Sequence, residues 1–137
     1  MDPPRTVQSL QQAINDHDLE AMVACFDPNY DSDQPAHPAR SFRGREQVRK
    51  NWTQILDGVP DLRAELKRWA ANGDEVWTEW EWRGTRREDG GPWVMRGVTI
   101  QGLRDDVVAW MRLYMEPVEV SGAGVEEVVA DLVEGRL

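Results

Sequence analysis

Four side chains in this 137-residue chain carry the chemistry of proton transfer and anion binding. Arg112 and Glu116 lie in a run that alternates like a strand. Asp33 and His37 lie in a loop that contains prolines. An arginine beside the hydroxyl of Tyr114 can hold an anionic or enolate oxygen, while a carboxylate or an imidazole moves the proton. The simpler alternatives are an ion pair for Arg112, a rim carboxylate for Glu116 and a solvated loop imidazole for His37.

Metal ligands are scarce in the sequence. The chain has one cysteine, Cys25, and two histidines, His17 and His37. Zinc sites are built mainly from cysteine and histidine, so we expect no metal site, and we expect no cofactor. Cys25 lies on an apolar helical stripe, which favours a small buried hydrophobic side chain over a reactive thiol.

The stretch Val76–Arg83 is the strand around which the other elements must be arranged. Its sequence, VWTEWEWR, alternates with period two. Thr78, Trp80 and Trp82 therefore share one face, and Trp77 shares the opposite face with charged residues. We predict a central strand whose aromatic face lines a pocket and whose charged face meets solvent or another subunit. Plain core packing is the alternative for the indoles.

The last predicted strand carries the charged candidates. Alternation places Trp110, Arg112, Tyr114 and Glu116 on one face, and Trp110 favours that face being the inner one. A buried arginine must be paired, so Arg112 is expected to meet a protein carboxylate or a ligand. Four residues of strand span about 13 Å, which is too far for Arg112 to pair directly with Glu116.

The elements that position these residues are three helices followed by strands. Apolar stripes predict the helices near residues 7–14, 19–26 and 48–56, and the strands fall at residues 62–70, 76–85, 93–103 and 107–116. This order predicts an α+β domain over residues 1–117. Residues 118–137 are predicted to form a linker and a short amphipathic C-terminal helix that docks on its own or a partner subunit.

Composition limits the possible partners. The formal net charge is −9, which argues against nucleic acid because phosphate contacts need a basic surface. No apolar run approaches the roughly 20 residues of a membrane span, and no signal peptide is evident. We expect a cytoplasmic protein that contacts neither nucleic acid nor membrane.

Three motifs together resemble a known family. They are AINDHDLEAMVACFDPNY near the start, SFRGREQVRKNW on the third helix and VVAWMRLYMEP on the last strand. Over residues 5–117 the chain resembles the SnoaL-like, polyketide cyclase-like branch of the nuclear-transport-factor-2-like superfamily. The resemblance implies a cone-shaped curved antiparallel sheet wrapped around three N-terminal helices, with a pocket at its open end.

The resemblance also implies which side chains face that pocket. The expected ligand is small and apolar or aromatic. The side chains expected to bind it are Trp52, Trp80, Trp82, Thr99, Gln101, Trp110 and Tyr114. The opposite faces of the last two strands, with Val94, Val98 and Ile100 and with Met111, Leu113 and Met115, are too apolar for bare solvent. They predict a homodimer through the outer face of the sheet.

The family's known chemistries can be compared with this chain position by position. Ketosteroid isomerases use tyrosine and two aspartates, and the matching positions here hold Leu10, Gln34 and Thr99. Limonene epoxide hydrolases use an Asp-Arg-Asp set, but Trp80 and Trp82 occupy two of those positions and no carboxylate remains. Both reactions are therefore not expected.

Two hypotheses remain open. In the first, the protein is a cofactor-free cyclase, isomerase or hydratase of an aromatic or polyketide-like substrate. Arg112, Glu116, Asp33 and His37 would then act on the substrate. In the second, it is a dimeric ligand-binding or structural module of the same fold without catalysis.

Overall fold

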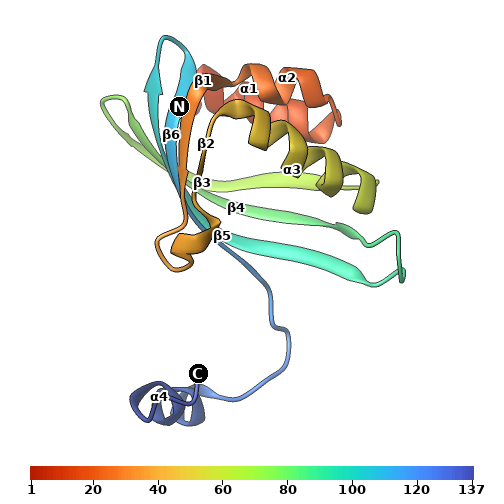
Figure 1. The fold of residues 1–137 in the computed structure, drawn as a ribbon, viewed down its shortest axis with the longest axis vertical. Coiled ribbons are helices and arrows are strands. Elements are labelled where there is room, and N and C mark those ends of the chain that lie inside the picture. The colour runs from red at the N-terminus through yellow and green to blue at the C-terminus, as the bar shows by residue number, and fades with distance from the viewer.

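The structure, a computed structural model of residues 1–137, contains one curved sheet with helices on its concave side (Figure 1). Helices α1 (Arg5–Asn15), α2 (Leu19–Ala24) and α3 (Arg45–Gly58) pack there. The strands are β1 (Phe26–Asp33), β2 (Phe42–Arg43), β3 (Arg63–Asn72), β4 (Glu75–Thr85), β5 (Pro92–Arg104) and β6 (Val107–Pro117). A short 3-10 turn, η1 (Pro38–Arg40), joins β1 to β2, and α4 (Val125–Val133) follows the sheet. The predicted α+β cone is confirmed.

The sheet has the order β2-β1-β6-β5-β4-β3. The four predicted strands form the expected antiparallel meander from β3 to β6. Two features go beyond it, because β1 pairs with β6 in parallel and β2 adds a short antiparallel edge. Gly73, with φ of +61°, makes the turn between β3 and β4 that the Asn72–Gly73 pair predicts.

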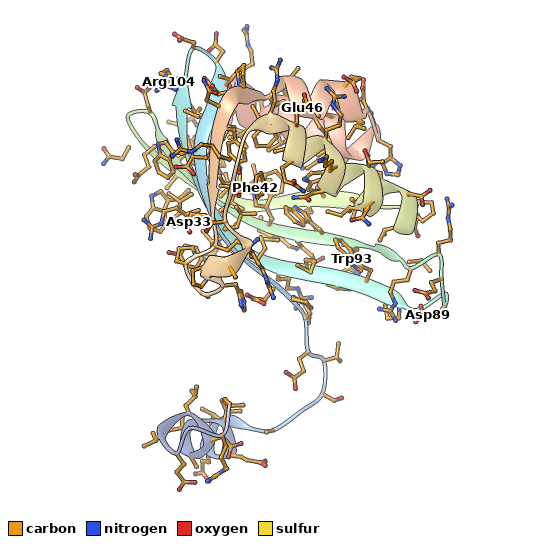
Figure 2. All side chains as sticks on the ribbon, viewed as in Figure 1. Asp33, Phe42, Glu46, Asp89, Trp93 and Arg104 are labelled. Carbon is orange, nitrogen blue, oxygen red and sulfur yellow. The ribbon has the colours of Figure 1, made fainter.

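The helices bury their apolar stripes against the concave face of the sheet (Figure 2). Val7, Leu10 and Ile14 of α1 and Val48 of α3 are all buried in one core with residues of the sheet. Helix α2 begins after its N-cap residue Asp18, whose carboxylate accepts a hydrogen bond from the backbone N–H of Ala21 at 3.1 Å. The helices thus close the concave side that the sheet leaves open.

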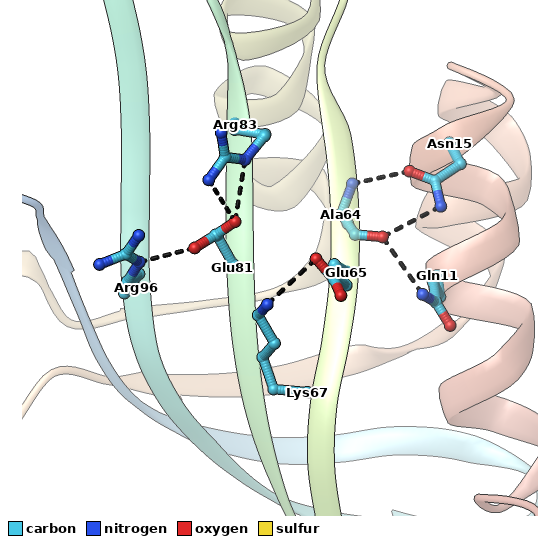
Figure 3. A network of polar contacts seen from close by, with 8 residues as sticks. All are labelled: Gln11, Asn15, Ala64, Glu65, Lys67, Glu81, Arg83 and Arg96. Carbon is cyan, nitrogen blue, oxygen red and sulfur yellow. Dashed lines mark hydrogen bonds and ion pairs between the residues drawn. The ribbon is translucent and has the colours of Figure 1, made fainter.

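Two polar side chains fix α1 to the edge of the sheet (Figure 3). Asn15 accepts a hydrogen bond from the backbone N–H of Ala64 on β3 at 2.7 Å and donates one to its carbonyl at 3.1 Å. Gln11 donates a second bond to the same carbonyl at 3.2 Å. Because β3 is the edge strand, these bonds satisfy backbone groups that no further strand would pair.

The predicted register of the tryptophan-rich strand is confirmed. Thr78 and Trp80 on β4 are buried, with 0% and 3% of their surface exposed, whereas Trp77 is 48% exposed on the other face. Trp82 faces the helices as well and packs against the core. Cys25 is also buried, as expected of a small hydrophobic side chain.

The predicted orientation of the last strand is wrong. Thr99, on the inner face of β5, pairs with Leu113 of β6, so the inner residues of β6 are Met111, Leu113 and Met115. Arg112, Tyr114 and Glu116 are therefore on the outer face and exposed, and Trp110 shares that face. The physical reason is desolvation: three alternating apolar side chains fill the concave side, and the arginine stays in water.

The chain leaves the sheet at Pro117, the last residue of β6. Val118 still donates a backbone hydrogen bond to Val94, and the following residues lead away to α4 (Figure 1). The C-terminal helix forms as predicted, but Val125, Val129, Leu132 and Val133 on it are 51–81% exposed. Helix α4 is thus not docked on its own domain. The domain boundary at residue 117 stays a prediction.

None of the helices is both long and apolar enough to cross a lipid bilayer.

Candidate functional site

A cavity of about 230 Å³ lies between the concave face of the sheet and the helices. Nineteen residues line it, and fourteen of them are hydrophobic. The apolar wall is formed by Leu10, Ile14, Phe26, Tyr30, Phe42, Val48, Trp52, Ile55, Trp80, Trp82, Met95, Met111, Leu113 and Met115. Such a lining, with a few polar groups, is typical of a site for a small apolar molecule.

Two tryptophans meet at the wall between α3 and β4. The rings of Trp52 and Trp82 form an edge-to-face contact, with centroids 5.4 Å apart and planes at 71°. The Trp82 indole Nε1 is buried and has no hydrogen-bond acceptor within the protein. This unpaired donor is unusual, because buried polar atoms are nearly always hydrogen-bonded.

Trp80, two residues earlier on the same face, is fully satisfied. Its Nε1 donates to the hydroxyls of Thr78 at 2.9 Å and Thr99 at 3.2 Å, and these two hydroxyls lie 2.7 Å apart. Gln101 completes the network, with its Oε1 2.8 Å from the Thr99 hydroxyl and its Nε2 3.2 Å from that of Thr78. The network joins β4 to β5 and includes two residues of the cavity lining, Trp80 and Thr99. The Gln101 amide makes its hydrogen bonds within this network, and Gln101 does not line the cavity, whereas Thr99 does.

Tyr30 brings a phenol to the cavity wall from β1. Only 2% of Tyr30 is exposed, and burial raises the pKa of its phenol well above the usual range. The phenol therefore stays protonated at neutral pH. A phenol in this state can donate a hydrogen bond but cannot act as a base.

The remaining polar lining consists of neutral groups and one cation. Ser32, Gln34, Asn51 and Thr99 are neutral, and Arg40 of η1 carries the charge. No aspartate, glutamate, histidine or cysteine is among the lining residues. No three of these side chains elsewhere in the chain lie close enough together to hold a metal ion. The cavity wall itself thus offers no group that takes up a proton at neutral pH.

The three positions compared with the ketosteroid isomerases all fall in this cavity. Leu10, Gln34 and Thr99 line it together, although they come from α1, from the end of β1 and from β5. The equivalence with the isomerase positions stays a prediction, and each of the three holds a residue that cannot exchange a proton as the isomerase groups do.

The four residues predicted to be catalytic lie outside the cavity lining. His37 Nε2 is 2.6 Å from a carboxylate oxygen of Glu116, and both side chains are partly exposed. Asp33 accepts a hydrogen bond from the Ser41 hydroxyl at 2.9 Å and pairs in register with Arg112 on the outer face. The structure thus gathers this set near one end of β6, on the solvent side. A role for them in function stays a prediction.

The predicted binding residues divide into two groups. Trp52, Trp80, Trp82 and Thr99 line the cavity, whereas Gln101, Trp110 and Tyr114 do not. Tyr114 is 40% exposed on the outer face. The Trp110 ring covers Gly102 there, since a Cβ added at Gly102 would lie 1.9 Å from the indole nitrogen. The expected inward position of Trp110 and Tyr114 is therefore wrong, for the same reason as that of Arg112.

Several lining residues were missed in the sequence. Asn51 belongs to the helical set Val48, Asn51, Trp52 and Ile55, whose i, i+3, i+4, i+7 spacing marks one face of α3. That spacing could have identified Asn51. Arg40 lies in a 3-10 turn after a proline, where no periodic signal exists.

The outer face carries an ion-pair cluster on β4 and β5 (Figure 3). Glu81, only 5% exposed, accepts hydrogen bonds from Arg96 at 2.6 Å and from Arg83 at 2.5 and 2.8 Å. The Arg96 bond, followed by that of Arg83, lowers the pKa of the Glu81 carboxyl. Glu81 thus pairs with Arg96 across the strands and with Arg83 along its own strand, while Glu79 pairs with Arg68 of β3 at 3.8 Å.

Together the curved sheet, the three helices and the apolar cavity define an α+β cone with an internal pocket. The chain belongs to the SnoaL-like domain family, which matches residues 7–111. This confirms the resemblance seen in the sequence. Among curated proteins, none matches the chain.

Three solved structures share the fold at low sequence identity. IdmH of Streptomyces antibioticus, a candidate polyketide cyclase, is 23% identical, with a TM-score of 0.71 over 81% of this chain and 89% of IdmH. Rv0760c of Mycobacterium tuberculosis, in complex with estradiol-17β-hemisuccinate, is 17% identical, with a TM-score of 0.67 over 80% and 89%. An LEH-like epoxide hydrolase of M. tuberculosis is 15% identical, with a TM-score of 0.68 over 82% of this chain and 80% of the hydrolase.

Proposed function

We propose that this protein binds a small, largely apolar, ring-containing molecule in its cavity. The observation that carries the proposal is the wall of fourteen hydrophobic residues, including the rings of Trp52, Trp80 and Trp82. Flat ligands gain both apolar burial and edge-to-face contacts from such rings. The ligand-bound state of the structural relative Rv0760c supports a small-molecule role for this cone.

The lining favours binding over catalysis as the primary function. Proton abstraction needs a base within hydrogen-bond reach of the reacting atom. The titratable lining groups are Tyr30 and Arg40, and neither accepts a proton at neutral pH. Selective binding, by contrast, needs only the shape, the rings and the few polar groups that this cavity has.

The test is isothermal titration calorimetry with 2-naphthamide, a neutral bicyclic probe. We expect binding to the wild type and at least a tenfold loss in Leu113→Trp, which fills the cavity. The matched control is Tyr114→Trp, which adds the same ring one residue further on but on the outer face. Equal affinity in both variants, with folding verified by circular dichroism, would remove the cavity from the proposal.

A cofactor-free acid/base enzyme is the second candidate, and one contact favours it. His37 and Glu116 form a 2.6 Å pair, which is how a carboxylate orients an imidazole for proton transfer. The pair adjoins the cavity in sequence, since Met115 and both Gln34 and Arg40 line it. A cyclase, isomerase or hydratase acting on an aromatic or polyketide-like substrate would need this pair at the cavity mouth.

Deuterium exchange tests the second candidate without knowledge of the substrate. A ketone with acidic α-hydrogens, 2-tetralone, is incubated with the protein in D₂O and followed by NMR. An enzyme of this kind accelerates exchange, and His37→Gln abolishes the acceleration without weakening tetralone binding. If the exchange rate with the protein equals the rate in buffer, the enzyme candidate is rejected and binding is the only proposed function that remains.

We further propose a cytoplasmic homodimer formed through the outer face of the sheet. Val94 and Val98 stay on that face as predicted, but Trp77 and Tyr114 replace the three inward residues Met111, Leu113 and Met115. Trp77 and Tyr114 are large, exposed side chains of the kind found at protein interfaces. Light scattering is expected to give twice the chain mass, and the mass of one chain for Trp77→Glu.

A further inference from the structure

Arg40 is the only charged side chain among the residues that line the cavity. It ends the 3-10 turn η1 between β1 and β2, and its side chain is exposed at that end of the cavity. The guanidinium group is always charged and presents donors in a fork that fits a carboxylate. An apolar cavity thus has one fixed positive charge at its edge.

This cation has no counter-ion in the protein. Its single side-chain contact is a long one, 3.5 Å from Nη1 to the amide oxygen of Gln34. Arg43, three residues further on, lies 3.5 Å from the carboxylate of Asp31. In a chain with 25 acidic and 16 basic residues, carboxylates are in excess, yet none lies beside Arg40.

The one buried polar side-chain atom without a partner, Nε1 of Trp82, is also a hydrogen-bond donor. Trp82 Nε1 is a hydrogen-bond donor only, and it has no acceptor. No carboxylate lines the cavity that would hold a cationic or amine ligand. The one charged group of the lining is therefore a cationic donor without a carboxylate partner, so the complementary ligand is negatively charged.

We propose that the ligand of this cavity is a singly charged organic acid with an apolar ring system. Arg40 binds the carboxylate at the edge of the cavity, and the ring lies against Trp52, Trp82 and the aliphatic wall. The proposal rests on the proposed binding function and adds the charge of the ligand to it. Discrimination against an uncharged analogue of the same shape follows from the charge-assisted bond, which that analogue lacks.

The experiment compares two probes of the same shape, 2-naphthoate and 2-naphthamide, by calorimetry on the full chain. An ion pair with an exposed group contributes at most about 1 kcal/mol, so we expect the wild type to bind the acid about three- to fivefold more tightly. Added salt should reduce this preference, because the guanidinium group is exposed. In Arg40→Gln the affinities for the two probes become equal.

Two further variants complete the test. Arg40→Lys keeps the charge and is expected to retain part of the preference for the acid. Arg43→Gln removes a neighbouring arginine that does not line the cavity, and it should bind both probes as the wild type does.

Three results would contradict the inference. Equal binding of acid and amide by the wild type overturns the charge preference. An equal loss in Arg43→Gln overturns the assignment of that preference to Arg40. Both results leave cavity binding intact. A wild type that binds neither probe overturns both the charge preference and the binding function.

Discussion

The concave and outer faces of the same sheet carry different kinds of side chain. On β6 the concave face presents Met111, Leu113 and Met115 to a cavity, and the outer face presents Arg112, Tyr114 and Glu116 to solvent. On β4, Trp80 is buried inside while Trp77 is half exposed outside. Every residue that was singled out for catalysis lies away from the cavity lining, where charges remain hydrated.

The two faces of the sheet differ in which of them carries side chains that can exchange protons. Residue types that exchange protons are frequent in the sequence, but a buried charge without a partner is costly. On strands with alternating side chains, titratable residues therefore lie on the outer face unless the interior offers them a partner. What distinguishes the cavity is instead a buried indole N–H without an acceptor on Trp82 and a cation without a counter-ion on Arg40.

The largest difference in stability is expected when glutamine replaces each of two neighbouring residues of β6, Met111 and Arg112. Met111→Gln should lower the free energy of unfolding by about 2–4 kcal/mol, since it removes apolar burial and leaves an amide in an apolar wall. Arg112→Gln, its neighbour on the outer face, should change it by less than about 0.5 kcal/mol. Denaturant unfolding of both variants measures the difference, and the reverse order would restore the register expected from the sequence.

A second test sharpens the comparison within the concave face. Trp80→Phe should cost about 1–3 kcal/mol, because Thr78 and Thr99 lose a buried hydrogen-bond donor. Trp82→Phe should leave stability within about 0.5 kcal/mol of the wild type, because it removes a donor that has no partner in the protein. Urea unfolding curves of the two variants decide the matter. A larger loss in Trp82→Phe would mean that its Nε1 has an acceptor after all.

The third test concerns the buried carboxylate of the outer face and its pH dependence. The pKa of Glu81 is lowered by Arg96 and then Arg83, so its ionised form stabilises the folded state. This stabilisation is fully present above the ordinary carboxyl pKa of about 4.3 and is lost as the pH falls through the lowered folded value. Glu81→Gln should therefore lower the melting temperature at pH 7, and the difference from the wild type should shrink below pH 4. A difference that grows on acidification would contradict the assigned pairing.

The smallest effect is expected at the His37–Glu116 pair. Both side chains are partly exposed, and such pairs contribute about 0–1 kcal/mol to stability. Glu116→Gln should therefore leave the melting temperature and the affinity for 2-naphthamide nearly unchanged. Thermal unfolding and calorimetry check both values. A marked loss of affinity would place the pair at the ligand.

The fold could be predicted further than the site could. Alternation in Val76–Arg83 and the helical stripes are local signals, and they gave the right elements and the right face of β4. The same alternation in β6 left two possible faces, and choosing Trp110 as the inner residue exchanged them. The parallel pairing of β1 with β6 joins distant segments, and no local pattern encodes it.

Site residues on regular elements were easier to find than those on turns. Trp52, Trp80, Trp82 and Thr99 were placed at the cavity by periodicity and resemblance. Arg40 was not, because its position depends on how η1 folds back between β1 and β2. Its charge is ordinary in the sequence and becomes informative only when its surroundings are known.

Helix α4 has a consequence that follows from its tether. Residues 118–124 separate it from the end of β6, and a chain of that length spans at most about 25 Å. Pro117 pairs with Met95, a residue of the cavity wall, so the edge of the cavity lies within the volume that this tether allows the helix to reach. Within that volume its effective concentration is in the millimolar range. The tethered helix would therefore occupy even a weak site there to an extent that does not change on dilution. A free peptide with the same sequence would reach the same occupancy only at millimolar concentration.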